Sequence, residues 1–483
     1  MLVALFTIVA IVGSFVVVRL GLPRVNVLTI FSAVWIPLIL VGSYPRVLFP
    51  GFTHGTWTLL LLALAGIVLG TFLATIWRLS DPATPSDIEQ HVSAVDVDRL
   101  IKIHVALCIV LFFYFLWQIY LIPQRLNINL NDILSIYFSS GNEGHQYRSL
   151  AFEARDLAHS SGYGIGGAAI LQGLVSYILF FVGNISLFTG ARLWLNKKRA
   201  LAAVPLMLAA AFSIFSLQRS AFLLLATLFL FSVVATKWAS PVAERVPADS
   251  TSEVCVGLSK NKSRQRRRRV AAVLIILLSV LVLFYPQYLR NRGTTNHVSP
   301  PELLLPYYLA GVGGLNYRDN NPDGGPVSFD GDSSVIVQAT PGSYTFSDFF
   351  ITLRRLDFPV HAAPLDFDYR TIEVSGVELH TNTGTMFFNF WLDFGLLGVF
   401  FITFGLALLT TFAQRLARQG RTVAIPALSL GMSAIFWSFS ANYFLGNLRY
   451  ILLIIAATVA IPRLLRMRDR SGFQTVRGLT PIG

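Results

Sequence analysis

Cysteines and metal-binding spacings are scarce in this chain of 483 residues. Its two cysteines, Cys108 and Cys255, are too few for a disulfide framework. Neither a CxxC pair nor an HExxH sequence occurs, and the eight histidines lack the spacing of metal ligands. The sequence therefore predicts no zinc site, and we expect no metal or other cofactor.

Glycine-rich phosphate loops are missing as well. The chain contains neither the GxxxxGK[ST] pattern nor a GxGxxG sequence that follows a strand-like run. ATP-driven pumping is therefore not expected from this chain.

Charge is also in short supply. Charged residues make up 13% of the chain, against about 25% in an average soluble domain. Apolar residues make up 54%, Phe alone contributes 38 residues, and the mean hydropathy is +0.62. A soluble protein of this length needs more polar surface than that. The composition predicts an all-α fold, a polytopic helical membrane protein.

Long apolar runs locate the expected spans. A helix needs about 20 mostly apolar residues to cross the hydrocarbon core. The chain has eleven such runs, at about 2–18, 26–43, 57–77, 103–122, 163–188, 201–217, 220–238, 270–286, 384–409, 423–440 and 448–462. Between the sixth and seventh, Gln218, Arg219 and Ser220 interrupt the apolar sequence, which predicts a tight hairpin.

Lys and Arg predict the orientation, because cytoplasmic loops carry an excess of both. Residues 239–269 hold the run Arg266 to Arg269 and are assigned to the cytoplasm. Because successive spans cross the membrane in opposite directions, the remaining loops are then assigned in turn to the inside and the outside. The inner segments hold 26 Lys and Arg against 9 Asp and Glu, and the outer segments hold 12 Lys and Arg against 15 Asp and Glu. We expect a multi-pass membrane protein with its N-terminus outside and its C-terminus inside.

Three regions follow from this topology. Residues 1–286 carry the first eight spans, with an outer loop at 123–162. Residues 287–383 form a large outer loop, in which we expect short amphipathic helices. Residues 384–483 hold the last three spans and a cytoplasmic tail. Loops beyond about 15 residues tend to be functional or disordered, so the outer face is the predicted active side.

The predicted outer segments hold only Arg as a cation, because all six lysines fall on the inner side. The guanidinium fork suits bidentate binding of phosphate or carboxylate. Aromatic and polar residues accompany these arginines in the outer segments. The candidate substrate-binding residues are Arg148, Arg155, Arg290, Arg354, Arg355, Tyr307, Tyr308, Asn382, Tyr443 and Arg449.

Two residues near the predicted spans are candidates for catalysis. Arg219 lies in the tight hairpin, where it either snorkels to the headgroups or holds a lipid phosphate. Asp393 lies inside the predicted ninth span, and a carboxylate there is a functional candidate by default. The alternative for Asp393 is a structural hydrogen bond or an ion pair to a neighbouring helix.

Three features of the chain carry a family resemblance. They are Ser-Leu-Gln-Arg-Ser-Ala in the hairpin (216–221), His-Thr-Asn-Thr-Gly-Thr at the end of the long loop (380–385), with Asp-Phe-Gly-Leu-Leu-Gly after it (393–398), and Asn-Leu-Arg-Tyr (447–450). Together they resemble the bacterial oligosaccharide repeat unit polymerases, the Wzy-type O-antigen and capsule polymerases. The O-antigen ligases share the same general plan.

The resemblance implies a glycosyltransferase of the outer face of the cytoplasmic membrane. Such an enzyme transfers a growing chain from undecaprenyl diphosphate to the next lipid-linked repeat unit. Its partners are the lipid-linked donor and acceptor, membrane lipids and a chain-length regulator, and nucleic acid is not expected.

A base must also take the proton of the acceptor hydroxyl. His380 is the leading candidate base and His361 the second, because both lie in the long outer loop. The alternatives are an O-antigen ligase and a lipid-linked oligosaccharide transporter or flippase. No internal repeat supports a transporter, because the long loop has no counterpart in the other half of the chain.

Overall fold

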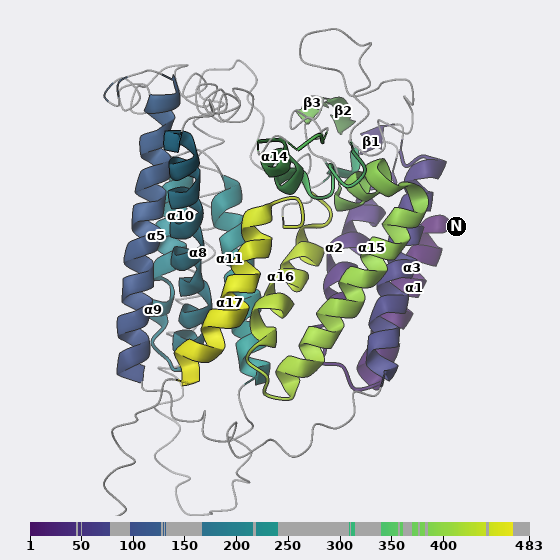
Figure 1. Ribbon diagram of the computed structural model, residues 1–483. Coiled ribbons are helices and arrows are strands. Elements are labelled where there is room, and N and C mark those ends of the chain that lie inside the picture. Colours follow the sequence, from purple (N-terminus) through teal and green to yellow (C-terminus); the bar gives the residue numbers. More distant parts are fainter. Residues whose placement is uncertain are drawn as a thin grey trace, which may run out of the picture.

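Figure 1 shows the computed structural model as a bundle of helices that run in nearly the same direction, up or down. Smaller elements cover one end of this bundle. The structure describes residues 1–44, 47–49, 51–77, 97–126, 129, 131, 167–215, 219–239, 309, 311–313, 340–355, 358–360, 370–374, 377–381, 385–440 and 444–466.

The helices coincide with the apolar runs. Ten of the eleven predicted runs fall on helices, and the run at 270–286 lies outside the described residues. The helices of the bundle are α1 (Leu2–Arg19), α2 (Val27–Gly42), α3 (His54–Ile76), α5 (Val97–Leu126), α8 (Gly167–Leu195), α9 (Arg199–Ala202), α10 (Val204–Phe215), α11 (Arg219–Ala239), α15 (Met386–Arg418), α16 (Ala424–Trp437) and α17 (Leu448–Arg466).

Length and composition indicate a membrane protein. Within the described parts of the chain, six helices are long and apolar enough to cross a membrane, namely α1, α3, α5, α8, α11 and α15. Four shorter apolar helical segments accompany them, in α2, α9–α10, α16 and α17. The helical membrane class is therefore confirmed, and the number of eleven spans stays a prediction.

Side-chain caps explain where several helices begin. The Asn26 side chain accepts a hydrogen bond from the Thr29 N–H at 3.0 Å, and the Thr29 hydroxyl accepts one from the Asn26 N–H at 2.9 Å. This reciprocal pair is a capping box. Thr53 and Thr385 cap α3 and α15 in the simpler way, through one side-chain oxygen.

Small residues bring α3 and α15 into close contact. A Cβ atom on Gly66 would collide with the Thr403 hydroxyl and lie 2.6 Å from the Phe400 carbonyl oxygen. Gly70 meets the backbone of α15 one turn further along. Without side chains at these positions the two backbones approach closely, which is how many membrane helices associate.

We therefore expect Gly66→Ala to destabilise the bundle, because the added methyl meets backbone that cannot move aside cheaply. Overpacking of this kind lowers the free energy of unfolding by about 1–3 kcal/mol. The matched control is Gly405→Ala on α15, since a Cβ at Gly405 meets nothing within 4 Å. Thermal unfolding of the purified protein measures both variants. Equal unfolding temperatures for the two would contradict the proposed packing.

A small sheet and a short helix lie at the upper end of the bundle in Figure 1. Strands β1 (Leu48–Phe49), β2 (Arg370–Val374) and β3 (Val377–Thr381) pair antiparallel in the order β1-β2-β3. Helix α14 (Ser347–Arg355) is strongly amphipathic. Helix α14 falls within residues 287–383, and the sheet is an addition to the predicted all-α fold.

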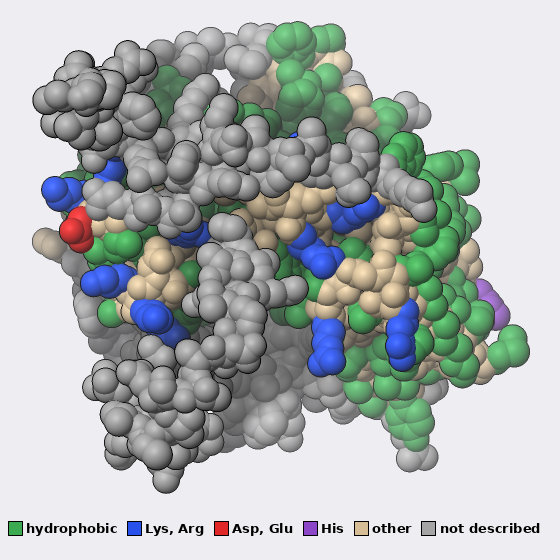
Figure 2. Space-filling view, turned by 90° about the horizontal axis from the view of Figure 1, so that it is seen from below, with side chains coloured by type: hydrophobic (Ala, Val, Ile, Leu, Met, Phe, Trp, Pro, Cys, Tyr) green, Lys and Arg blue, Asp and Glu red, His purple; other side chains and the backbone are tan. Residues whose placement is uncertain are grey.

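The other end of the bundle carries the basic side chains, and we call it the basic end. Figure 2 shows Lys and Arg side chains spread over this face. They include residues in the last turns of four helices: Arg19, Arg192, Lys237, Arg415 and Arg418. Arg418 donates a hydrogen bond to the Gly21 carbonyl at 2.6 Å, so these cations also tie the helix ends together.

Candidate functional site

Arg449 is the best-defined candidate residue in the described structure. It lies in the first turn of α17, at the end of the bundle opposite the basic end. Its backbone N–H donates to the Asn447 side-chain oxygen at 3.0 Å, which fixes the start of the helix. The backbone that carries the guanidinium is thereby fixed at this end of the bundle.

Two tyrosines from other helices surround the Arg449 guanidinium. It lies 5.2 Å from the centre of the Tyr177 ring, in α8, as a cation–π pair. The hydroxyls of Tyr177 and of Tyr114, in α5, also act on it electrostatically. Tyr114 is buried. These tyrosines have no distinctive sequence signal, because both lie inside apolar runs that predict only membrane spans.

The Nε atom of Arg449 is buried and has no hydrogen-bond partner among the described residues. A buried donor without a partner costs about 1–3 kcal/mol, more when the group is charged. Arg449 is therefore a fixed cation with one donor unused, a state that suits the binding of an anion. We call Arg449, Tyr114 and Tyr177 the Arg449 cluster.

Helix α14 lies over this cluster. The Asp348 N–H and the Ser347 hydroxyl both donate to the Gly446 carbonyl, at 3.0 and 3.1 Å. The Asp348 carboxylate also acts on Arg449 electrostatically. Because Arg354 and Arg355 are the last two residues of α14, this helix brings two further predicted arginines to the same end of the bundle as Arg449.

Asp393 holds the segment that leads into α14. Its two carboxylate oxygens accept hydrogen bonds from the backbone N–H groups of Tyr344 and Thr345, at 3.1 and 2.5 Å. Asn389, one turn earlier, donates to the Tyr344 carbonyl at 3.1 Å. These contacts favour the structural alternative for Asp393, since it ties the long loop to α15.

A break in α15 explains why Asp393 can reach this segment. Gly395 has φ +65° and ψ −161° inside the helix, a conformation that glycine adopts without steric cost. The break separates residues 386–394 from the long remainder of α15. Asp393 thus belongs to the short segment before the break, whereas an unbroken span was predicted there.

Arg219 is the first residue of α11, as the predicted hairpin requires. The start of α11 is tied to α10, because the Phe222 N–H donates to the Ser213 hydroxyl at 3.0 Å. Phe222 itself is buried. The backbone at Arg219 is therefore fixed by two packed helices, and its side chain lies outside the described part of the structure.

The remaining candidates divide into two groups. His380 lies in β3 opposite Thr371 of β2, so it belongs to the sheet at the Arg449 end, and its side chain is not described. The other candidates lie outside the described residues: His361, Arg148, Arg155, Arg290, Tyr307, Tyr308, Asn382 and Tyr443. Their roles stay predictions.

Comparison of the chain with protein-family models, with curated proteins and with solved structures gives no match. The resemblance to repeat unit polymerases therefore rests on the sequence features alone. Among the described residues, no group of three or more His, Cys, Asp or Glu is placed to hold a metal ion.

Proposed function

We propose that this membrane protein is a glycosyltransferase that polymerises undecaprenyl-diphosphate-linked oligosaccharide units into surface polysaccharide. The observation that supports it best is the Arg449 cluster, a fixed cation with an unused buried donor. It lies beneath an amphipathic helix, opposite the basic end of the bundle. By the excess of Lys and Arg, the basic end faces the cytoplasm and the cluster faces outward.

The chemistry that follows is substitution at an anomeric carbon. The bond between the donor sugar and the diphosphate breaks, and a new glycosidic bond forms with the acceptor hydroxyl. The hydroxyl proton goes to a base, and the negative charge remains on the lipid diphosphate. Arginines held in a site of low dielectric stabilise that charge as it builds. The donor carries its own activation, so no nucleotide is required.

Two alternatives use the same site differently. A ligase takes the same donor and transfers the chain to a different acceptor. A transporter binds the lipid diphosphate and moves it without breaking a bond. The site lies at one end of the bundle, whereas transporter sites are typically near the membrane midplane. This placement favours a transferase.

Purified protein incubated with a lipid-linked repeat unit tests the proposal. We expect a ladder of products that differ by one repeat unit. A single product on a foreign acceptor would indicate a ligase, and unchanged substrate under conditions that keep the protein folded would refute transferase activity.

His380 is the proposed base for the acceptor hydroxyl. We expect His380→Ala to lower the polymerisation rate by about 10²–10⁴-fold, the usual contribution of a positioned base. The matched control is Thr371→Ala, at the position opposite His380 in the sheet, which tests for simple loss of strand pairing. Wild-type rate and chain length in the His380 variant would contradict the assignment.

A further inference from the structure

The turn that joins α8 to α9 carries three consecutive cations at the basic end. Lys197 and Lys198 are exposed, and Arg199 is the first residue of α9. Of the acids that the structure describes, the helix ends at the basic end carry only Asp98, in the first turn of α5. The charge around the turn is therefore positive. We call Lys197, Lys198 and Arg199 the basic turn.

The backbone of the basic turn has a form that usually requires glycine. The Lys198 N–H donates to the Leu193 carbonyl at 3.0 Å, and the Lys197 N–H donates to the Trp194 carbonyl at 3.2 Å. These two bonds form a Schellman motif, which ends many helices and has a left-handed position normally filled by glycine. Lys197 occupies that position, at φ +67°, and is the one non-glycine residue with positive φ in the described part of the chain. A side chain makes this conformation unfavourable, so the strain points to a role for the lysine side chain itself.

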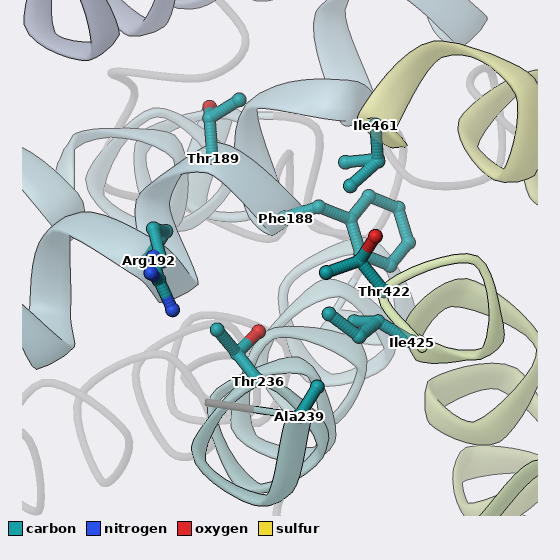
Figure 3. Close-up of a pocket in the computed structure, with 8 residues that line it drawn as sticks. All are labelled: Phe188, Thr189, Arg192, Thr236, Ala239, Thr422, Ile425 and Ile461. Carbon is teal, nitrogen blue, oxygen red and sulfur yellow. The ribbon is translucent and has the colours of Figure 1, made fainter. Parts of the chain in front are cut away.

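The cation nearest the turn within α8 is directed differently. In Figure 3 the Arg192 guanidinium points into a small pocket between α8, α11, α17 and the region where α16 begins. That pocket has room for about one water molecule, so it does not admit a larger ligand. Arg192 is thus directed into the bundle, whereas the basic turn presents its two lysines at the surface.

The neighbours of the basic turn are typical of a membrane interface. Trp194 lies in the last turn of α8, and the Arg199 guanidinium lies 5.6 Å from the centre of its ring. Tryptophan is enriched at the level of the lipid headgroups. The apolar helix α10 follows the turn, and its Met207 is 59% exposed. Acyl chains cover such an apolar surface in a membrane protein, which places the cations of the turn at headgroup level.

We propose that the basic turn binds the headgroup phosphates of anionic phospholipids. Ammonium and guanidinium groups are donors that suit phosphate oxygens, and cations near a membrane surface attract anionic lipid. Glycine at position 197 would relieve the strain but would supply no charge. The acyl chains of the bound lipid lie along the exposed side of α10. This site is independent of the proposed transferase activity.

The test measures the unfolding temperature of the purified full-length protein in neutral detergent, first without lipid and then with increasing phosphatidylglycerol. Phosphatidylcholine with the same acyl chains and inorganic phosphate are the comparison probes. We expect phosphatidylglycerol alone to raise the unfolding temperature in a saturable manner. Lys197→Gln and Lys198→Gln should each weaken its apparent affinity by about 5-fold, the usual effect of one cation at a membrane surface.

Lys197→Gly separates the role of the cation from that of the backbone. We expect it to lose as much affinity for phosphatidylglycerol as Lys197→Gln. Without lipid, however, it should unfold about 1–2 °C above the wild-type protein, because glycine relieves the strain at this position. A lower unfolding temperature in Lys197→Gly would mean that the lysine serves to stabilise the end of α8 through the helix dipole, and would overturn the proposal.

Lys237→Gln is the matched control, because it removes an exposed lysine from the end of α11, also at the basic end. It should keep the wild-type affinity. An equal loss in Lys237→Gln would show attraction to the basic end as a whole and would overturn the proposal, as would wild-type affinity in both Lys197→Gln and Lys198→Gln. An equal effect of phosphatidylcholine or of inorganic phosphate would also overturn it, since the site would then not select an anionic lipid.

Discussion

Replacing Arg449 with alanine is expected to reduce polymer formation by about 10²–10³-fold, the usual effect of removing one group that stabilises charge in a transition state. The guanidinium is held by Tyr114 and Tyr177 and keeps a buried Nε without a partner among the described residues. Under the proposed function, a diphosphate oxygen supplies that missing partner. Arg449→Lys keeps the charge but loses the fork, so we expect an intermediate loss. Steady-state kinetics on a lipid-linked substrate measures both variants.

The Arg449 prediction needs a control for folding, because the guanidinium also joins α17 to α5 and α8. Tyr177→Phe keeps the aromatic ring beneath the cation and removes only the hydroxyl, so it should lose far less activity than Arg449→Ala. Arg421→Ala removes an exposed cation at the basic end and should leave activity unchanged. If Arg449→Ala unfolds at the wild-type temperature and polymerises at the wild-type rate, the cluster has no catalytic role.

Arg219→Ala is expected to be nearly inactive, again by about 10²–10³-fold. The hairpin between α10 and α11 fixes the backbone of Arg219, through the bond from the Phe222 N–H to Ser213. Under the proposed function and orientation, a cation so placed contacts the lipid diphosphate at the outer headgroups. Charge builds on the leaving oxygen during the reaction, so we expect the loss in kcat rather than in KM. Arg219→Lys should be impaired less severely.

Lys237→Ala serves as the control for Arg219, since it removes an exposed cation from the other end of the same helix. It should keep normal activity and membrane insertion. Near wild-type polymerisation by Arg219→Ala would mean that the side chain merely snorkels to the headgroups. The donor site would then have to be sought at Arg449 or at Arg354 and Arg355.

Hydropathy predicted the bundle well because apolar runs and helices share one cause, the exclusion of unpaired backbone groups from lipid. Hydropathy predicted the positions of the helix ends less accurately. The run predicted at 103–122 belongs to a helix that spans Val97–Leu126, because polar residues such as Asp98 and Lys102 continue the helix beyond the apolar core. Similarly, α15 continues past the predicted end at residue 409 to Arg418. The Arg418 guanidinium donates a hydrogen bond to the Gly21 carbonyl.

The sheet could not be read from the sequence, because β1 is only two residues long and pairs with β2 more than 300 residues later. The Arg449 cluster was predicted in part. Arg449 stood out as a cation at the end of an apolar run, whereas Tyr114 and Tyr177 resemble any other aromatic residues of a span. Asp393 stood out as a carboxylate inside an apolar run. The break at Gly395 decides what it contacts, and that break has no distinctive sequence signal.

The release of undecaprenyl diphosphate tests the central proposal most directly. The measurement uses purified protein in detergent, a donor labelled in its lipid and an acceptor labelled in its sugar. We predict one undecaprenyl diphosphate released for each glycosidic bond formed, with release lost in both Arg449→Ala and Arg219→Ala. Substrate that is bound, or moved across reconstituted vesicles, while no undecaprenyl diphosphate is released would contradict a transferase and support a transporter.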